Sequence, residues 1–181
     1  MQEESSPVSF RANVARLPAK GLPVVVEADA KQRESLAAIH HLVSVERYRA
    51  ELLVTPWNRN GVRVGGVVEA DITQECVVTL DLVTASIREK VEGLFLPEDS
   101  KLGRQGFNGA GEIVLDADGP DSPETFSGDT IDVGALAEEF FGLAIDPYPR
   151  KPDAAIESAG EADGGPDGVL QQKLRQLTGK S

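Results

Sequence analysis

Cysteine and histidine side chains that could act as a nucleophile and its base are few in this chain. Cys76 is the single cysteine, and His40 and His41 are the two histidines. A catalytic cysteine needs a base that holds it as thiolate, and nothing in the spacing relates Cys76 to His40. The apolar run 76–82 instead predicts that Cys76 is a small apolar residue inside a strand. We therefore predict no catalytic residue, and one cysteine excludes both an internal disulfide framework and a cysteine-rich zinc cage.

Carboxylates form the second group that could do chemistry, since clustered oxygens can bind a divalent cation. The clusters are Glu98–Asp99, Asp116–Asp121 and Glu138–Glu139. Residues 116–119 resemble the start of a calcium loop, but the twelfth position, where that loop needs glutamate, is Ser127. The glycines between 103 and 111 do not join a strand to a helix, as a dinucleotide-binding loop requires. We expect no metal, no cofactor and no small-molecule substrate.

The proline-rich run Asp146–Pro152 is the most unusual local feature of the sequence. Three prolines favour an extended polyproline II conformation, which costs little entropy to bind. Such a segment would present Tyr148, Arg150 and Lys151 to a partner at fixed spacing. An alternative is that the run only holds the end of a preceding helix at the surface, and both interpretations can be true together.

Charge is unevenly distributed along the chain. Residues 1–63 carry nine Lys/Arg and seven Asp/Glu, a net +2, whereas residues 64–181 carry nine and twenty-three, a net −14. Phosphate neutralisation dominates affinity for nucleic acids, so the overall −12 disfavours general RNA binding and favours a basic protein partner. The alternative is direct RNA binding through basic residues that gather on one face. The candidates are Arg11, Arg47, Arg49, Arg59 and Arg63.

Alternating apolar positions predict most of the strands. We expect strands at 8–15, 22–28 and 44–54, a tight turn at 58–61, and a returning strand at 62–72 that pairs with 44–54. Gly66 falls where a bulge or a close backbone approach would fit. The runs 76–82 and 87–95 predict one antiparallel ribbon. The segment 98–128 is rich in glycine, aspartate and proline and predicts a long acidic loop, with 113–115 as a possible short strand.

Two helices are expected in the same domain. Asp29 with Gln32 resembles a capping box, and the inner face of that helix would consist of Leu36, Ile39 and Val43. Asp132 is a good N-cap for a second, buried helix that must stop near Ile145, before the prolines. Its predicted apolar face is Leu136, Phe140 and Leu143, widened by Ala137, Phe141 and Ala144.

These elements predict an α+β fold, in which a mostly antiparallel, strongly twisted or partly closed sheet packs with two helices. The predicted organisation is a flexible start at 1–7, one domain at 8–152, a disordered acidic linker at 153–168, and a short amphipathic helix at 169–178. That helix is too short to be stable alone and should dock on its own domain or on a partner. No apolar run reaches 18 residues and the N-terminus lacks the features of a signal peptide, so we expect a cytoplasmic protein without membrane contact.

Two stretches together carry a family resemblance. Residues 64–81 read VGGVVEADITQECVVTLD, and the run IDVG at 131–134 is followed by LAIDPYPRKP at 143–152. In order and spacing they resemble the YceD family of ribosomal RNA accumulation factors, over about residues 8–153, and the run at 74–80 with the proline-rich end resembles the alphaproteobacterial branch. Many members have a second cysteine where this chain has Thr79, and often proline where it has Leu82.

The resemblance implies a role in accumulation or processing of large-subunit ribosomal RNA, and no catalytic residues are established for the family. We expect a non-enzymatic ribosome-biogenesis factor whose partner is a ribosomal protein or a pre-ribosomal particle. Ribosomal RNA is the alternative direct partner. A metal-dependent hydrolase or nuclease that uses the acidic residues is the third hypothesis.

Overall fold

The computed structural model describes residues 5–98 and 123–151, with every side chain in these ranges except that of Arg59. Most of the predicted acidic loop 98–128, the linker 153–168 and the helix 169–178 lie outside the described residues. The elements in chain order are β1 (Arg11–Asn13), β2 (Leu22–Glu27), α1 (Ala30–Ile39), β3 (Ser44–Trp57), the 3₁₀ turn η1 (Asn58–Asn60), β4 (Gly61–Glu75), β5 (Leu82–Pro97), β6 (Glu124–Phe126), β7 (Thr130–Asp132) and α2 (Val133–Ala144).

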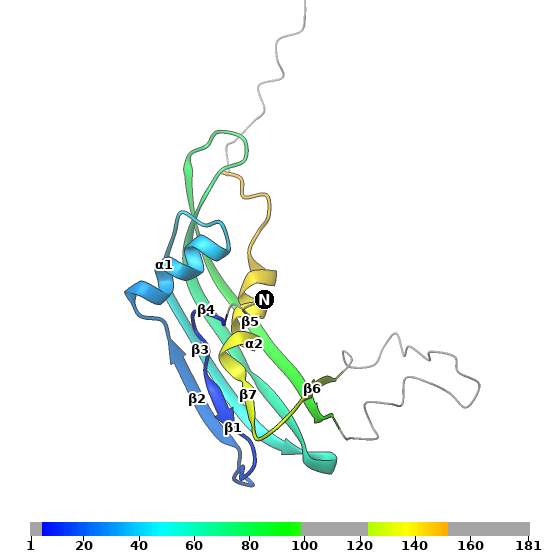
Figure 1. Ribbon diagram of the computed structural model, residues 1–181. Helices are drawn as coiled ribbons and strands as arrows, with labels where there is room; N and C mark the ends of the chain where they lie inside the picture. The colour runs from blue at the N-terminus through cyan, green and yellow to red at the C-terminus, as the bar shows by residue number, and fades with distance from the viewer. Residues whose placement is uncertain (1–4, 99–122, 152–181) are drawn as a thin grey trace, which may run out of the picture.

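Five strands form the main sheet, in the order β2-β3-β4-β5-β6. All neighbours are antiparallel except β6, which lies parallel to β5. β1 and β7 form a separate two-stranded antiparallel ribbon. Figure 1 shows the long strands β3, β4 and β5 crossed on one face by α2, with α1 covering the same face near β3. The predicted α+β class is confirmed, and the sheet is open rather than closed.

The predicted hairpin of β3 and β4 is confirmed, and its register pairs Val54 with Val64. Asn60 adopts the positive φ of 63° that the turn requires. The inward residues are those predicted from the alternation: Tyr48, Ala50, Leu52, Val54, Val62, Val64, Val68, Ala70 and Ile72. Gly66 sits at a close approach between the strands, because a Cβ there would lie 2.1 Å from the Glu51 carbonyl oxygen.

The helix α1 begins as predicted, with a capping box between Asp29 and Gln32. Its predicted inner face is wrong in two of three positions. Leu36 is buried, but Ile39 and Val43 are about half exposed, at 51% and 48%. The helix ends at Ile39, and the chain then turns at His41, whose φ is 55°. Val43 therefore leaves the helix altogether, and burial against β3 falls on Leu36 and its neighbour Ala37.

The second predicted helix is confirmed as α2, capped by Asp132, whose carboxylate accepts hydrogen bonds from the amides of Ala135 (3.0 Å) and Phe10 (2.9 Å). Its buried apolar residues are Val133, Leu136, Ala137 and Phe141, which pack over β4 and β5. Leu143 was expected on this face but is 76% exposed, since it is the penultimate residue of the helix and lies beyond the last buried residue, Phe141.

Two strand predictions need correction. The run 76–82 is not a strand: β4 continues to Glu75, which pairs with Leu82 at the start of β5, so residues 76–81 form the reversal between them. Leu80 has a φ of 61°, a value that a strand excludes. The first strand is also shorter than predicted, because the chain at Val8–Phe10 lies against the first turn of α2 and only Arg11–Asn13 pair with β7.

Among the described residues no helix is long and apolar enough to cross a membrane.

Candidate functional site

The turn between β4 and β5 (residues 76–81) meets the segment that leaves α2 (residues 145–151), and we call this meeting point the turn–exit junction. The amide of Val77 donates a hydrogen bond to the Pro149 carbonyl oxygen at 3.0 Å. The side-chain amide of Gln74 donates to the Asp146 carbonyl oxygen, also at 3.0 Å. Figure 1 shows the orange exit segment running up to the green turn. The junction thus joins two stretches that are far apart in the sequence.

Cys76 lies inside this junction with its side chain fully buried. It is a turn residue and not the strand residue that its neighbours predicted: its amide donates to the Asp81 carbonyl oxygen at 2.8 Å, and the Leu80 amide donates to the carbonyl oxygen of Cys76 at 2.9 Å. Hydrogen bonds from the Thr79 side chain, and from the amides of Lys151, Thr79 and Val78, lower the pKa of the thiol to about 6. Enclosed in this way, the sulfur holds the turn and cannot reach an external substrate.

The three residues predicted to bind a partner lie on the exit segment in different settings. Tyr148 is 70% exposed and Arg150 is exposed, on either side of the buried Pro149. Lys151 is exposed as well, but its Nζ forms an ion pair with Asp81 at 3.1 Å, which lowers the pKa of that carboxylate. Tyr148 and Arg150 are therefore presented to solvent, whereas Lys151 also fastens the exit segment to the turn.

Exposed apolar side chains gather in the segments that meet at this end of the domain. Seven of the ten large apolar residues that are exposed in the described part lie at the end of α1, in or beside the β4–β5 turn, or at the end of α2 and the exit segment. We call these seven the apolar end: Ile39, Val43, Val77, Leu80, Leu82, Leu143 and Tyr148. Sequence patterns missed this surface because period and hydrophobicity predict such residues to be buried.

A groove of about 660 Å³ opens within the apolar end. Ala38 and Val43 line it from α1 and the loop after it, Glu75 and Val77 from the β4–β5 side, and Pro147 and Pro149 from the exit segment. Glu75 contributes the one carboxylate among the lining residues. The groove is open; seven of its ten lining residues are apolar, and His41, Gln74 and Glu75 are polar. This mixed lining suits a peptide segment, which offers both apolar side chains and polar groups.

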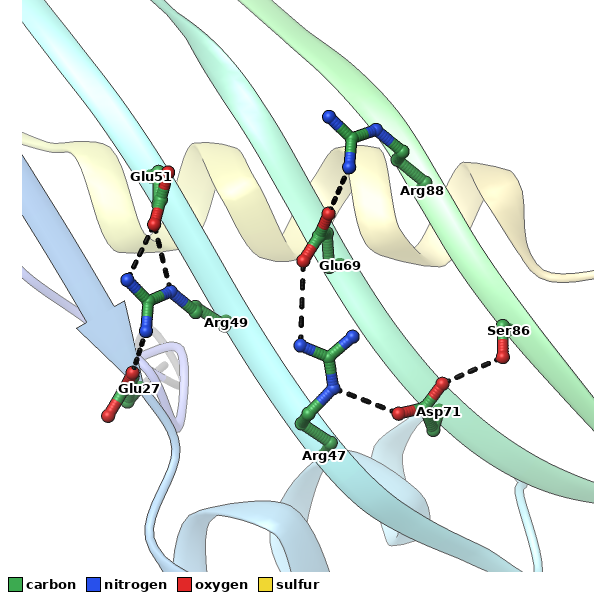
Figure 2. Close-up of polar contacts among 8 residues, drawn as sticks. All are labelled: Glu27, Arg47, Arg49, Glu51, Glu69, Asp71, Ser86 and Arg88. Atoms are coloured by element: carbon green, nitrogen blue, oxygen red, sulfur yellow. Dashed lines mark hydrogen bonds and ion pairs between the residues drawn. The ribbon is translucent and has the colours of Figure 1, made fainter.

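The opposite face of the sheet carries a row of alternating charges across four strands. The register places Glu27 beside Arg49, Arg49 beside Glu69, and Glu69 beside Arg88. Figure 2 shows Arg49 pairing with Glu27 and Glu51, and Arg88 with Glu69, while α2 runs behind the strands. Opposite charges side by side across strands are mutually stabilising, so these cations and anions largely neutralise one another.

The five arginines considered for RNA binding fall in several places. Arg47 and Arg49 share the outer face of β3; Arg47 Nε lies 2.9 Å from Asp71 and its Nη1 lies 3.5 Å from Glu69. Arg63 is on β4, 3.3 Å from Glu92. Arg11 is in β1, outside the main sheet, and the side chain of Arg59, in η1, is not described. The three arginines on the main sheet therefore each face a carboxylate.

A buried polar pair lies between the two helices on the inner face. His40 Nε2 is 3.1 Å from Glu138 Oε1, and Glu138 is only 9% exposed. Burial raises the pKa of Glu138, but hydrogen bonds from His40 and Ser6 outweigh it, and the pKa is below its ordinary value. The nearby Tyr48 hydroxyl is buried without a partner among the described residues, and its ring packs edge-on against Phe141, with the two ring centroids 5.4 Å apart.

The described residues contain no group of three acidic, histidine or cysteine side chains that could hold a metal.

The family model described as "Large ribosomal RNA subunit accumulation protein YceD" matches residues 64–176. The chain belongs to the YceD family. The matched region begins on β4 and includes β5, α2 and the whole turn–exit junction. No curated protein and no solved structure matches the chain. The YceD name connects the family with accumulation of large-subunit ribosomal RNA.

Proposed function

We propose that this protein is a ribosome-biogenesis factor that acts by binding, without catalysis, and supports accumulation or processing of large-subunit ribosomal RNA in the cytoplasm. The match to the YceD family over residues 64–176 is the observation that carries this proposal. The enclosed thiol of Cys76 and the paired charges of the outer face agree with a binding role, since neither presents a reactive group to a substrate.

The direct partner in this proposal is a basic ribosomal protein or a pre-ribosomal particle that presents one. The chain carries a net charge of −12, and its excess of acid lies in residues 64–181. Such a charge attracts basic proteins and repels the phosphates of free RNA. Tyr148, Arg150 and Lys151 on the exit segment are the contact residues that we propose for this partner.

Sedimentation of cell lysate tests the role. At low salt the protein should sediment with precursors of the large ribosomal subunit and should leave them as salt rises, because electrostatic contacts are screened. A strain without the gene should accumulate less large-subunit RNA. A protein found only in the free fractions, together with normal large-subunit RNA in the deletion strain, would contradict the proposal.

Substitutions on the exit segment test the contact surface. Replacing Tyr148 and Arg150 by serine should reduce co-purification with pre-ribosomal particles, because both side chains are exposed and can reach a partner. Val25→Ser is the matched control, since Val25 is an exposed apolar residue on β2. Equal recovery of particles with both variants would show that the partner binds at another place on the protein.

Direct RNA binding through Arg11, Arg47, Arg49, Arg59 and Arg63 is the competing mode. Binding phosphate would require Arg47, Arg49 and Arg63 to exchange their carboxylate partners for it. Under our proposal, Arg59→Glu with Arg63→Glu leaves binding to the particle unchanged, as does the control pair Arg16→Glu with Lys20→Glu. Loss of binding to purified ribosomal RNA fragments in the first pair alone would favour the direct mode.

A further inference from the structure

The groove of the apolar end is uncovered in the described part of the chain, and its surroundings are unusually apolar. Leu143, Leu80 and Tyr148 are each at least 70% exposed. Apolar side chains concentrated in one place on a surface mark a binding site more often than scattered ones do. The described part of the chain ends at Lys151, two residues after Pro149, which itself lines the groove.

A segment of the same chain has the pattern that this groove requires. Leu170, Leu174 and Leu177 recur at helical spacing and would form one apolar stripe. A helix over residues 169–178 would be about 15 Å long, too short to be stable in water without docking. The family match extends to residue 176, so this segment is part of what the YceD family shares.

Reach and charge favour docking within one chain. Residues 152–168 separate the groove from this segment, and a linker of seventeen residues with random-coil behaviour spans about 20–25 Å on average. A tether of this length gives an effective concentration in the millimolar range. The stretch 168–181 carries Lys173, Arg175 and Lys180 and no acidic residue. Glu75, which lines the groove, and Asp146, on the exit segment, are both exposed, and neither forms an ion pair within the described ranges.

We propose that residues 169–178 of the same chain form a helix that lies in the groove between the end of α1, the β4–β5 turn and the exit segment, with Leu170, Leu174 and Leu177 against the apolar residues among those that line it. The docked segment covers Val43 and Val77, and its cations lie near Glu75 and Asp146. This self-docking holds whatever the ribosomal partner is.

Paramagnetic broadening in the purified full chain tests the proposal without any ribosomal component. A nitroxide label is placed on a cysteine introduced by Gln172→Cys; the buried Cys76 is left in place, and the unsubstituted chain treated with the same reagent is the control for its labelling. We expect the amide signals of Val43 and Val77 to be more than halved relative to the reduced label. The amide of Leu53, towards the other end of β3, should keep its intensity.

Two matched variants define the outcome. In the labelled chain, Leu170→Ser with Leu174→Ser should abolish the broadening, whereas Gln171→Ser with Gln176→Ser should preserve it. Equal broadening of Val77 and Leu53, or its survival in the leucine variant, would overturn the proposal. So would the same broadening in isotope-labelled chains that carry no nitroxide when they are mixed with separate nitroxide-labelled chains, because the segment would then bind a second copy.

Discussion

The amide of Val77 in the β4–β5 turn donates a hydrogen bond to the carbonyl oxygen of Pro149, two residues before the end of the exit segment. The Gln74 side chain supports this link from β4 through its hydrogen bond to Asp146, and Gln74 is 9% exposed. The turn and the exit segment are therefore joined by a backbone hydrogen bond and by a hydrogen bond from the buried side chain of Gln74.

Gln74→Leu should loosen the exit segment. The substitution leaves the Asp146 carbonyl without its donor, at a cost of roughly 1 kcal/mol, and the Val77 amide should exchange its hydrogen faster. Lys151→Met is the control: it removes only the exposed ion pair with Asp81, worth about 0–1 kcal/mol. Native-state hydrogen exchange measures both. Faster exchange at Val77 in the Lys151 variant than in the Gln74 variant would contradict this assignment.

Gly66→Ala should strongly destabilise the β3–β4 hairpin. A Cβ at this position would lie 2.1 Å from the Glu51 carbonyl oxygen, which is backbone and can move only with the strand. We expect a loss of roughly 1–3 kcal/mol in the free energy of unfolding. Gly65→Ala, one residue earlier, meets no atom within 4 Å and should change stability little or increase it slightly. Urea unfolding of the two variants checks this, and equal midpoints would refute the close approach.

His40→Asn should destabilise the fold by roughly 1–3 kcal/mol, because it leaves the buried carboxylate of Glu138 without its imidazole partner. His41→Asn is the matched control: His41 is exposed at a φ of 55°, which asparagine tolerates, so stability should stay within about 0.5 kcal/mol. Thermal unfolding at neutral pH distinguishes the two. A larger loss in the His41 variant would show that the inner pair does not stabilise the fold.

The same pair predicts how stability depends on acid pH. The pKa of Glu138 is lower in the folded protein than its ordinary value, so ionised Glu138 stabilises the fold above that ordinary pKa. This contribution is lost as pH falls through the lowered value. Glu138→Gln should therefore flatten the acid side of the stability profile measured by urea unfolding. A profile of unchanged steepness would mean that another carboxylate sets it.

Local patterns predicted much of this fold. The alternation of 44–54 and 62–72 identified a hairpin and its buried face, and the capping residues Asp29 and Asp132 located the starts of both helices. These predictions succeed because strand period and helix caps depend on neighbours in sequence. The paired arginines were not predicted, since Arg47 meets Asp71 and Glu69 only through strand register.

The turn–exit junction could not be found from sequence, for a related reason. Residues 76–80 have the composition of a strand, and only the pairing of Glu75 with Leu82 makes them a turn. Likewise Leu143 and Ile39 fit the period of their helices, but each lies in the last turn of its helix and is more than half exposed. The strand β6, which pairs with β5, could not be predicted because three residues are too few to show an alternation of apolar and polar positions.

The buried thiol of Cys76 accepts several hydrogen bonds, and these predict a second pH dependence of stability, near neutral pH. Donors from Thr79, Lys151 and Val78 lower the pKa of the thiol to about 6 in the folded protein, against about 8.5 in an unfolded chain. The thiolate therefore stabilises the fold fully above the pKa of the thiol in the unfolded chain, and this stabilisation is lost as pH falls towards about 6.

Thr79→Val removes the hydroxyl donor, so the gain in stability between these pH values should shrink. Thr84→Val, at an exposed position on β5, should leave that gain unchanged. Urea unfolding across this pH range, with thiolate absorbance recorded in parallel, tests the assignment, and an identical pH dependence in wild type and Thr79→Val would refute it.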